Sequence, residues 1–244
     1  MKTRRVLMDA GNSSLKWAVV EAGQWCTQGR CNYADWDALK AELTAGSDCF
    51  IASVAGPERE QQLAALLDAT EISSTWWLRS EASFADLKNT YLDPLQLGVD
   101  RWMGLIAARQ RNREAVLVVS VGTAMTVDAL TAEGVFLGGV IVPGASLMRQ
   151  VLQQGTAGVA DTGGLWQAFP RTTADAVQSG IVSALCGAIQ KQHARLAEIA
   201  GVMPHCMLTG GDAAIVLPHL GLAAEMVPAL VLEGIDCVAR EGTR

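Results

Sequence analysis

Three short segments of the chain combine small residues with groups that can bind an anion. They read DAGNSSLK at residues 9–16, SVGTAMT at residues 120–126 and TGGD at residues 209–212. Glycines and hydroxyl residues between two strands let several backbone N–H groups point at one spot, which makes a concave site for phosphate. Each segment also has an ordinary structural reading, as a hairpin turn or, for TGGD, as a helix N-cap by Asp212. Their occurrence together favours phosphate binding.

Charged and hydroxyl side chains in these segments suit the phosphates of a nucleotide. Asp9 stands where the first predicted strand ends, so its carboxylate can hold a hydrated Mg²⁺ ion on the phosphates. Lys16 can neutralise phosphate charge, and Thr123 and Thr126 can donate their hydroxyls. The glycines of TGGD permit the close approach of a flat base.

A fourth segment, LGVDRW at Leu97–Trp102, offers a base and a fixed cation side by side. Gly98 lets a ligand approach the backbone. Asp100 begins a predicted helix and is a candidate to accept a hydroxyl proton during phosphoryl transfer. The alternative is that Asp100 only caps the helix and that Arg101 lies on the surface.

The elements around these segments form one plan that occurs twice. A strand, a turn of small residues and two further strands are predicted over residues 5–31 and again over residues 115–142, and Gly11 and Gly122 lie 111 residues apart. We therefore predict a duplicated α/β fold with two mixed β-sheets, whose lobes span residues 1–112 and 113–244 and face each other across a cleft. Helical patterns are predicted at about residues 33–43, 57–69, 100–110, 173–200 and 228–240.

Composition narrows the function classes. The 244 residues carry a net charge of −6, which gives no support to a nucleic-acid-binding role, because binding of the phosphate backbone needs a basic face. No uncharged run reaches the roughly 18 residues of a membrane helix, and the apolar start is too short for a signal peptide, so we expect a cytoplasmic protein without membrane contact. Half of the residues are hydrophobic, which predicts a large core that includes Trp17, Trp76, Trp77 and Trp102.

The three turns in this order resemble the actin, sugar-kinase and heat-shock ATPase superfamily, which clamps ATP between two ribonuclease-H-like lobes. Within it, the chain resembles the type III pantothenate kinases through motifs spread over most of its length. The matching segments are DAGNSSLKW at Asp9–Trp17, LGVDRW at Leu97–Trp102, VGTAMTVD at Val121–Asp128, GGVIVPGASLM at Gly138–Met148, TADAVQSGI at Thr173–Ile181 and LTGGD at Leu208–Asp212.

The resemblance implies an activity and a set of site residues. Members of the family use ATP to phosphorylate the terminal hydroxyl of pantothenate, the first step of coenzyme A synthesis, and are homodimers with the active site near the subunit interface. It implies Asp100 as the base, Asp9 beside Mg²⁺ and Thr123 at the ATP phosphates. The implied phosphate loop is Asp9, Ala10, Gly11, Asn12, Ser13, Ser14, Leu15 and Lys16, and the implied pantothenate pocket is Tyr91, Gly98, Val99, Asp100, Arg101 and Thr173.

One position departs from the family pattern. Ser120 stands where the family usually carries an aspartate that helps bind a monovalent cation, K⁺ or NH₄⁺. A serine hydroxyl is neutral, so we expect reduced dependence on that cation. Two other functions stay open, namely a kinase for another small hydroxylated substrate and a catalytically weak regulatory or accessory protein on the same fold.

Overall fold

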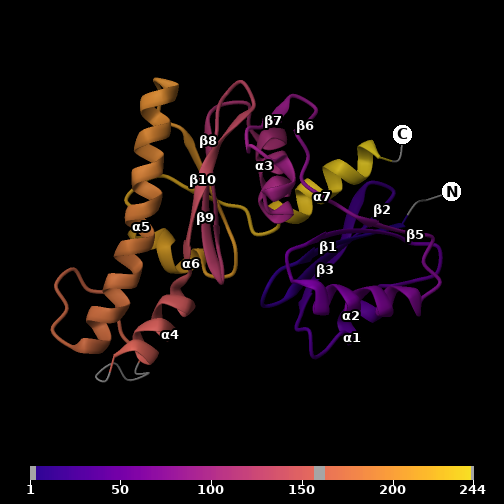
Figure 1. Cartoon of the computed structure of the whole chain (residues 1–244), viewed down its shortest axis with the longest axis horizontal. Coiled ribbons are helices and arrows are strands. Elements are labelled where there is room, and N and C mark those ends of the chain that lie inside the picture. Colours follow the sequence, from indigo (N-terminus) through magenta and orange to yellow (C-terminus); the bar gives the residue numbers. More distant parts are fainter. Residues whose placement is uncertain (1–3, 157–162, 243–244) are drawn as a thin grey trace. The chain divides into compact units, whose positions relative to one another are not determined.

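The computed structural model describes residues 4–156 and 163–242, which form two compact units (Figure 1). The first unit holds the chain up to Ala85, Asn89–Arg111 and the part from Ala229 onward, and the second holds Asp86–Lys88 and Asn112–Pro228. Each unit is built on a mixed sheet, so the predicted duplicated α/β fold is confirmed.

The sheet of the first unit has five strands in the order β3-β2-β1-β4-β5. They are β1 (Arg4–Ala10), β2 (Leu15–Glu21), β3 (Gln24–Cys31), β4 (Asp48–Ser53) and β5 (Ser74–Trp77). The pairs β1–β2 and β2–β3 are antiparallel, whereas β4 runs parallel to β1 and β5 runs parallel to β4. The turn at residues 11–14 therefore joins two paired strands, as predicted.

Helices cover both faces of this sheet. On one face, Leu39 of α1 (Asp37–Lys40) and Leu63 of α2 (Pro57–Asp68) belong to a buried cluster with Val6 and Met8 of β1. Successive strand residues point to opposite faces, so Arg5, Leu7 and Asp9 point to the other face. That face is covered by α3 (Val99–Arg111) and α7 (Leu230–Glu241), which contact β4 and β1 (Figure 1).

Helix α7 is fixed to the first unit by a buried polar contact. The Arg5 guanidinium lies 3.4 Å from a carboxylate oxygen of Asp236, and Trp25 Nε1 donates a hydrogen bond of 3.2 Å to the other oxygen. A Cβ atom on Gly234 would lie 1.9 Å from the carbonyl oxygen of Met103, so this glycine lets α7 approach α3 closely. The sequence-based division assigned residues 229–244 to the second lobe, whereas α7 packs in the first unit.

The second unit repeats the strand plan. Most strands of the seven-stranded sheet belong to this unit, and its order is β12-β11-β8-β9-β10-β7-β6, with β8–β9 and β9–β10 antiparallel and β11 parallel to β8. The strands are β6 (Ser83–Phe84), β7 (Leu87–Asn89), β8 (Val116–Val121), β9 (Ala124–Leu130), β10 (Val135–Pro143), β11 (His205–Thr209) and β12 (Glu225–Met226). The helices are α4 (Ala145–Gly155), α5 (Thr173–Ala200) and α6 (Ala213–Val216).

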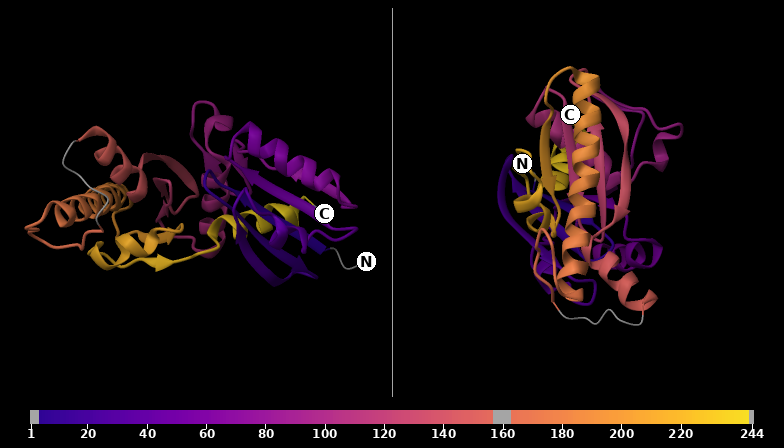
Figure 2. Two further views of the ribbon diagram at one scale, coloured as in Figure 1. Left: turned by 90° about the horizontal axis from the view of Figure 1, so that it is seen from below. Right: turned by 90° about the vertical axis from the view of Figure 1, so that its left-hand side faces the viewer.

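Helix α5 has the bounds that its apolar repeat predicts. Ile181, Leu185 and Ile189, four residues apart, are buried against the sheet of the second unit, and the helix runs along it in Figure 2. Gly201, with a φ of 69°, ends the helix in the left-handed conformation. No helix in the described parts of the chain is both long and apolar enough to cross a membrane.

Some predicted features were wrong. The helical pattern at residues 33–43 gives only the four residues of α1, because the bridge between Asn32 and Asp35 delays the helix. Helix α4 and strands β6 and β7 were not predicted. Trp17 and Trp102 are buried, but Trp76 and Trp77 are 51% and 37% exposed, because they belong to β5 at the edge of its sheet.

Candidate active site

Asp9 and Lys16 face each other at the carboxyl end of β1. They are register partners in the antiparallel β1–β2 pair, and Lys16 Nζ lies 3.3 Å from Asp9 Oδ2. Asp9 is only 6% exposed, and Lys16 is partly open to solvent. The pair is thus an anion and a cation at one end of the central strand, which is the arrangement expected for a metal-bound phosphate.

Asp100 lies in the first turn of α3. Its Oδ1 accepts a hydrogen bond of 2.8 Å from the backbone N–H of Arg101. A Cβ atom on residue 98 would lie 2.7 Å from that oxygen, so Gly98 leaves the room in which the carboxylate sits. Helix capping and a chemical role are both compatible with this geometry, because Oδ1 accepts the N–H bond while Asp100 Oδ2 can still take a proton.

Burial raises the pKa of both carboxyl groups above the ordinary value of 3.8. For Asp9, the negative charge of Asp100 raises the pKa further, and Lys16 lowers it by less than burial raises it. For Asp100, the N–H group and positive charge of Arg101 and the charge of Lys16 lower the pKa, but burial again dominates. Asp9, Lys16 and Asp100 therefore form one electrostatic cluster, in which the positive charge is too small to offset the burial of the two carboxylates.

Arg101 and Tyr91 form a second contact beside Asp100. Arg101 is buried to 7% exposure although it lies at a helix N-terminus, where a cation is unfavourable. Its Nη1 donates a hydrogen bond of 2.8 Å to the hydroxyl of Tyr91, and the guanidinium lies 5.6 Å from the centre of the Tyr91 ring. The alternative prediction that Arg101 lies on the surface is therefore wrong.

The segment that carries Tyr91 and Gly98 is held by two residues outside the implied pocket. Asn89 accepts from the Tyr91 N–H at 3.1 Å and donates to the carbonyls of Glu81 and Pro94. Ser80 donates to the carbonyl of Leu97 at 2.8 Å. No local pattern marks either residue, because the partners of Ser80 and some of those of Asn89 lie eight or more residues away.

The turn of residues 10–14 is open at its tip and held at its base. Asn12 and Ser13 are exposed, and the N–H of Gly11 bonds the carbonyl of Ser14 at 3.1 Å. The Ser14 hydroxyl is buried and accepts from Arg30 Nε at 2.9 Å. Ala10 and Leu15 also belong to the implied phosphate loop at residues 9–16. Their side chains are part of the core, so only their backbone can contact a ligand.

The second unit holds the other predicted residues. Thr123 is exposed at the tip of the β8–β9 turn, and Ser120 lies half-buried on β8. A Cβ atom on Gly144 would lie 1.9 Å from the carbonyl oxygen of Gly122, and one on Gly210 would lie 2.2 Å from that of Val121. The backbone around Gly144 and that around Gly210 therefore both pack against the backbone of the β8–β9 turn.

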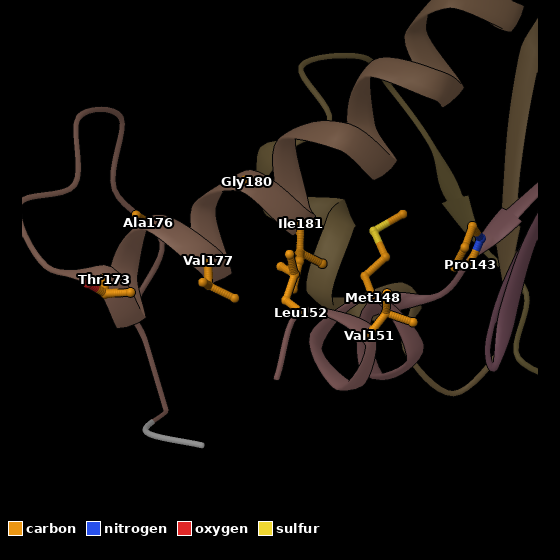
Figure 3. Close-up of a pocket in the computed structure, with 9 residues that line it drawn as sticks. All are labelled: Pro143, Met148, Val151, Leu152, Thr173, Ala176, Val177, Gly180 and Ile181. Atoms are coloured by element: carbon orange, nitrogen blue, oxygen red, sulfur yellow. The ribbon is translucent and has the colours of Figure 1, made fainter. Parts of the chain in front are cut away.

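Thr173 is the first residue of α5 and lies at a pocket of about 580 Å³ between α4 and α5 (Figure 3). The pocket is almost entirely apolar. Its lining consists of Pro143, Met148, Val151, Leu152, Thr173, Ala176, Val177, Gly180 and Ile181.

Comparison with known proteins decides the family. A family model described as type III pantothenate kinase matches residues 5–195. The chain belongs to the type III pantothenate kinase family. The type III pantothenate kinase of Thiobacillus denitrificans is 64% identical over 240 residues and that of Chromobacterium violaceum is 41% identical over 241, with at least 96% of each chain covered.

Solved structures show the same fold at low sequence identity. A Campylobacter jejuni protein assigned to the Baf family of transcriptional activators has a TM-score of 0.62 at 19% identity, with 98% of both chains covered. A Sinorhizobium meliloti protein assigned as a 2-dehydro-3-deoxygalactonokinase has the same TM-score at 15% identity, with 97% of this chain and 98% of that chain covered. These two likenesses concern the fold of this pantothenate kinase family member alone.

The cluster fits a magnesium ion that is shared with a substrate. The residues described here contain no group of three or more histidine, cysteine or acidic side chains arranged for a metal. Mg²⁺, however, is usually bound through one or two carboxylates together with phosphate oxygens and water. Asp9, buried and short of positive charge, supplies such a carboxylate.

The raised pKa of Asp100 predicts how stability depends on pH. The folded state binds the proton more tightly than the unfolded state, so this stabilisation is complete below pH 3.8 and is lost as the pH rises through the raised folded pKa. Asp100→Asn mimics the protonated form. Denaturant unfolding of the ligand-free protein should show this variant to be more stable than wild type at pH 7, with the difference shrinking toward pH 4.

Asp175→Asn is the matched control. This exposed carboxylate accepts the Leu165 N–H, which lowers its pKa, so its removal should destabilise the protein at neutral pH. If the free energy of unfolding of Asp100→Asn depends on pH in the same way as that of wild type, burial of Asp100 does not raise its pKa.

Proposed function

We propose that this protein transfers the γ-phosphoryl group of ATP to the terminal hydroxyl of pantothenate, which begins coenzyme A synthesis. The observation that carries the proposal is the half-buried Asp100, whose carboxylate accepts the Arg101 N–H and interacts electrostatically with Asp9, Lys16 and Arg101. We place the reaction in the cytoplasm, and the six free cysteines are consistent with a reducing compartment.

Asp100 acts as the base in this proposal. The pantothenate hydroxyl oxygen attacks the γ-phosphorus, the bond from that phosphorus to the β–γ bridging oxygen breaks, and the hydroxyl proton passes to the Asp100 carboxylate. A raised pKa brings a carboxylate closer to the working pH, where a general base is most effective. ADP leaves with the bridging oxygen.

The phosphate loop at residues 9–16 binds the nucleotide phosphates. Its exposed tip offers backbone N–H groups, and Lys16 supplies positive charge. Asp9 would hold Mg²⁺, which neutralises charge on the phosphates when bound. Thr123, exposed on the turn of the second unit, is assigned to the nucleotide phosphates on the family pattern alone.

Tyr91, Gly98, Val99 and Arg101 of the first unit are the proposed pantothenate-binding residues, and Thr173 is added to them on the family pattern alone. Pantothenate carries a carboxylate, and a buried guanidinium is the side chain best suited to bind one. Arg101 meets this requirement, because its burial leaves little water to compete. Tyr91, fixed by Asn89 and by Arg101, gives the pocket a rigid wall.

Release of ADP from ATP tests the activity. We expect ADP when pantothenate is added and none with a panel of sugars. Asp100→Asn should lower turnover by about 10²–10⁴-fold, the usual contribution of a positioned base, while an ATP analogue still binds. ADP release with a sugar would point to another kinase, and absence of release with every acceptor would point to the regulatory alternative. Wild-type turnover in the variant would remove Asp100 from this role.

We also propose that the protein is a homodimer that pairs through the α4–α5 surface. Val151 and Leu152 on α4 are 57% and 37% exposed, beside the apolar pocket. Leu165 and Phe169, in the segment before α5, are exposed to 73% and 89%. Apolar side chains exposed in such number commonly mark a protein interface.

Sedimentation velocity checks the dimer. Val151→Glu places a charge in the apolar surface, so we expect this variant to sediment as a monomer at concentrations where wild type is dimeric. Gln154→Glu adds the same charge to an exposed position of the same helix outside the pocket lining and should leave the dimer intact. Equal sedimentation of Val151→Glu and wild type would place the interface elsewhere.

Ser120 should weaken or remove the dependence on a monovalent cation. Hard cations are held by oxygen ligands, and the charge of those ligands sets the affinity, so a hydroxyl cannot replace a carboxylate. We expect similar activity in Tris buffer with and without KCl for wild type, and activation by K⁺ in Ser120→Asp. Strong, saturable activation of the wild type at low millimolar K⁺ contradicts this expectation.

A further inference from the structure

Tyr33 contacts the phosphate loop from outside the predicted site. It lies two residues after β3, and its hydroxyl donates a hydrogen bond of 2.5 Å to the carbonyl oxygen of Gly11. The residue is half-buried, so this bond is partly shielded from water. Gly11 and Tyr33 are 22 residues apart, and the contact exists only because β2 and β3 fold back on β1.

The ring of Tyr33 is itself fixed on two sides. The guanidinium carbon of Arg59, in the first turn of α2, lies 4.6 Å from the ring centre. The ring of Trp36 meets it edge-on, with 5.5 Å between centres. Both arrangements are favourable for an aromatic ring, so the hydroxyl is held in place rather than free to turn away.

Fixing the Gly11 carbonyl also fixes a donor on the other side of the peptide. The peptide bond is planar and trans, so the Gly11 C=O and the Asn12 N–H point in opposite directions. The hydrogen bond from Tyr33 therefore sets the direction of the Asn12 N–H. Asn12 is exposed at the tip of the loop, where a ligand can reach it.

We propose that Tyr33 is a positioning residue for the nucleotide, which aims the Asn12 N–H at the phosphates of ATP by holding the Gly11 carbonyl. This inference rests on the proposed role of residues 9–16 as the phosphate loop. Tyr33 itself touches no phosphate and acts through the backbone.

The protonation state of Tyr33 agrees with this role. Burial raises the pKa of Tyr33 to about 12. The charge of Arg59 lowers this pKa, and the charge of Asp9 raises it. The hydroxyl therefore keeps its proton and remains a donor over the whole range in which a kinase works.

Tyr33→Phe tests the inference, because it removes the hydroxyl and keeps the ring between Arg59 and Trp36. We expect a nonhydrolysable ATP analogue with Mg²⁺ to bind about three- to tenfold more weakly in calorimetric titration, as for the loss of one hydrogen bond. The KM for ATP should rise by the same factor, with the KM for pantothenate and the melting temperature close to wild type.

Tyr91→Phe is a reciprocal variant, since Tyr33 and Tyr91 are the only tyrosines of the chain. It should raise the KM for pantothenate and leave the affinity for the ATP analogue unchanged. Unchanged analogue affinity in Tyr33→Phe overturns the inference. A parallel rise of both KM values together with a lower melting temperature also overturns it, because it shows a general structural role. Calorimetry decides on Tyr33 even if pantothenate is not the acceptor.

Discussion

The strand register of the first unit depends on a carboxylate, that of Asp9, which is buried at the end of the central strand. Asp9 is 6% exposed, and Lys16 on the neighbouring strand lies 3.3 Å from its carboxylate. Burying a carboxylate is costly unless it is paired and hydrogen-bonded. The register therefore has to be kept, since a slip of one residue would turn Asp9 into the opposite, apolar face of the sheet.

The same register extends the charged row across the sheet. Asp9 pairs with Lys16, and Lys16 pairs with Arg30, so the three side chains lie in one line over three strands on the same face. On the other face, Gly29 gives room for the Trp17 ring, because a Cβ atom there would lie 2.4 Å from it. One face of the sheet is thus apolar, whereas the other combines buried apolar side chains with this charged row at the end next to the β1–β2 loop.

Much of this could be predicted from the sequence, because the signals are local. The repeated strand plan, the bounds of α5 and the carboxylates at Asp9 and Asp100 all depend on patterns within about thirty residues. The unpredicted features depend on distant partners. Helical periodicity identified α7, but only its contacts with distant residues, such as those of Asp236 with Arg5 and Trp25, assign it to the first unit. Likewise, Tyr33 and Ser80 become functional candidates only when the backbone groups that they bond are known.

The charge balance of the cluster explains why residues so distant in the chain have to act together. Two carboxylates with raised pKa values share one lysine, so the ligand-free site is held in an unfavourable state by the packing around it. A Mg²⁺ ion would supply the missing positive charge at Asp9, which then leaves Lys16 to the phosphates. A proton received from the acceptor hydroxyl would neutralise Asp100. Each event of the proposed reaction therefore relieves a charge that folding has buried, and sites for catalysis commonly give up stability in this way.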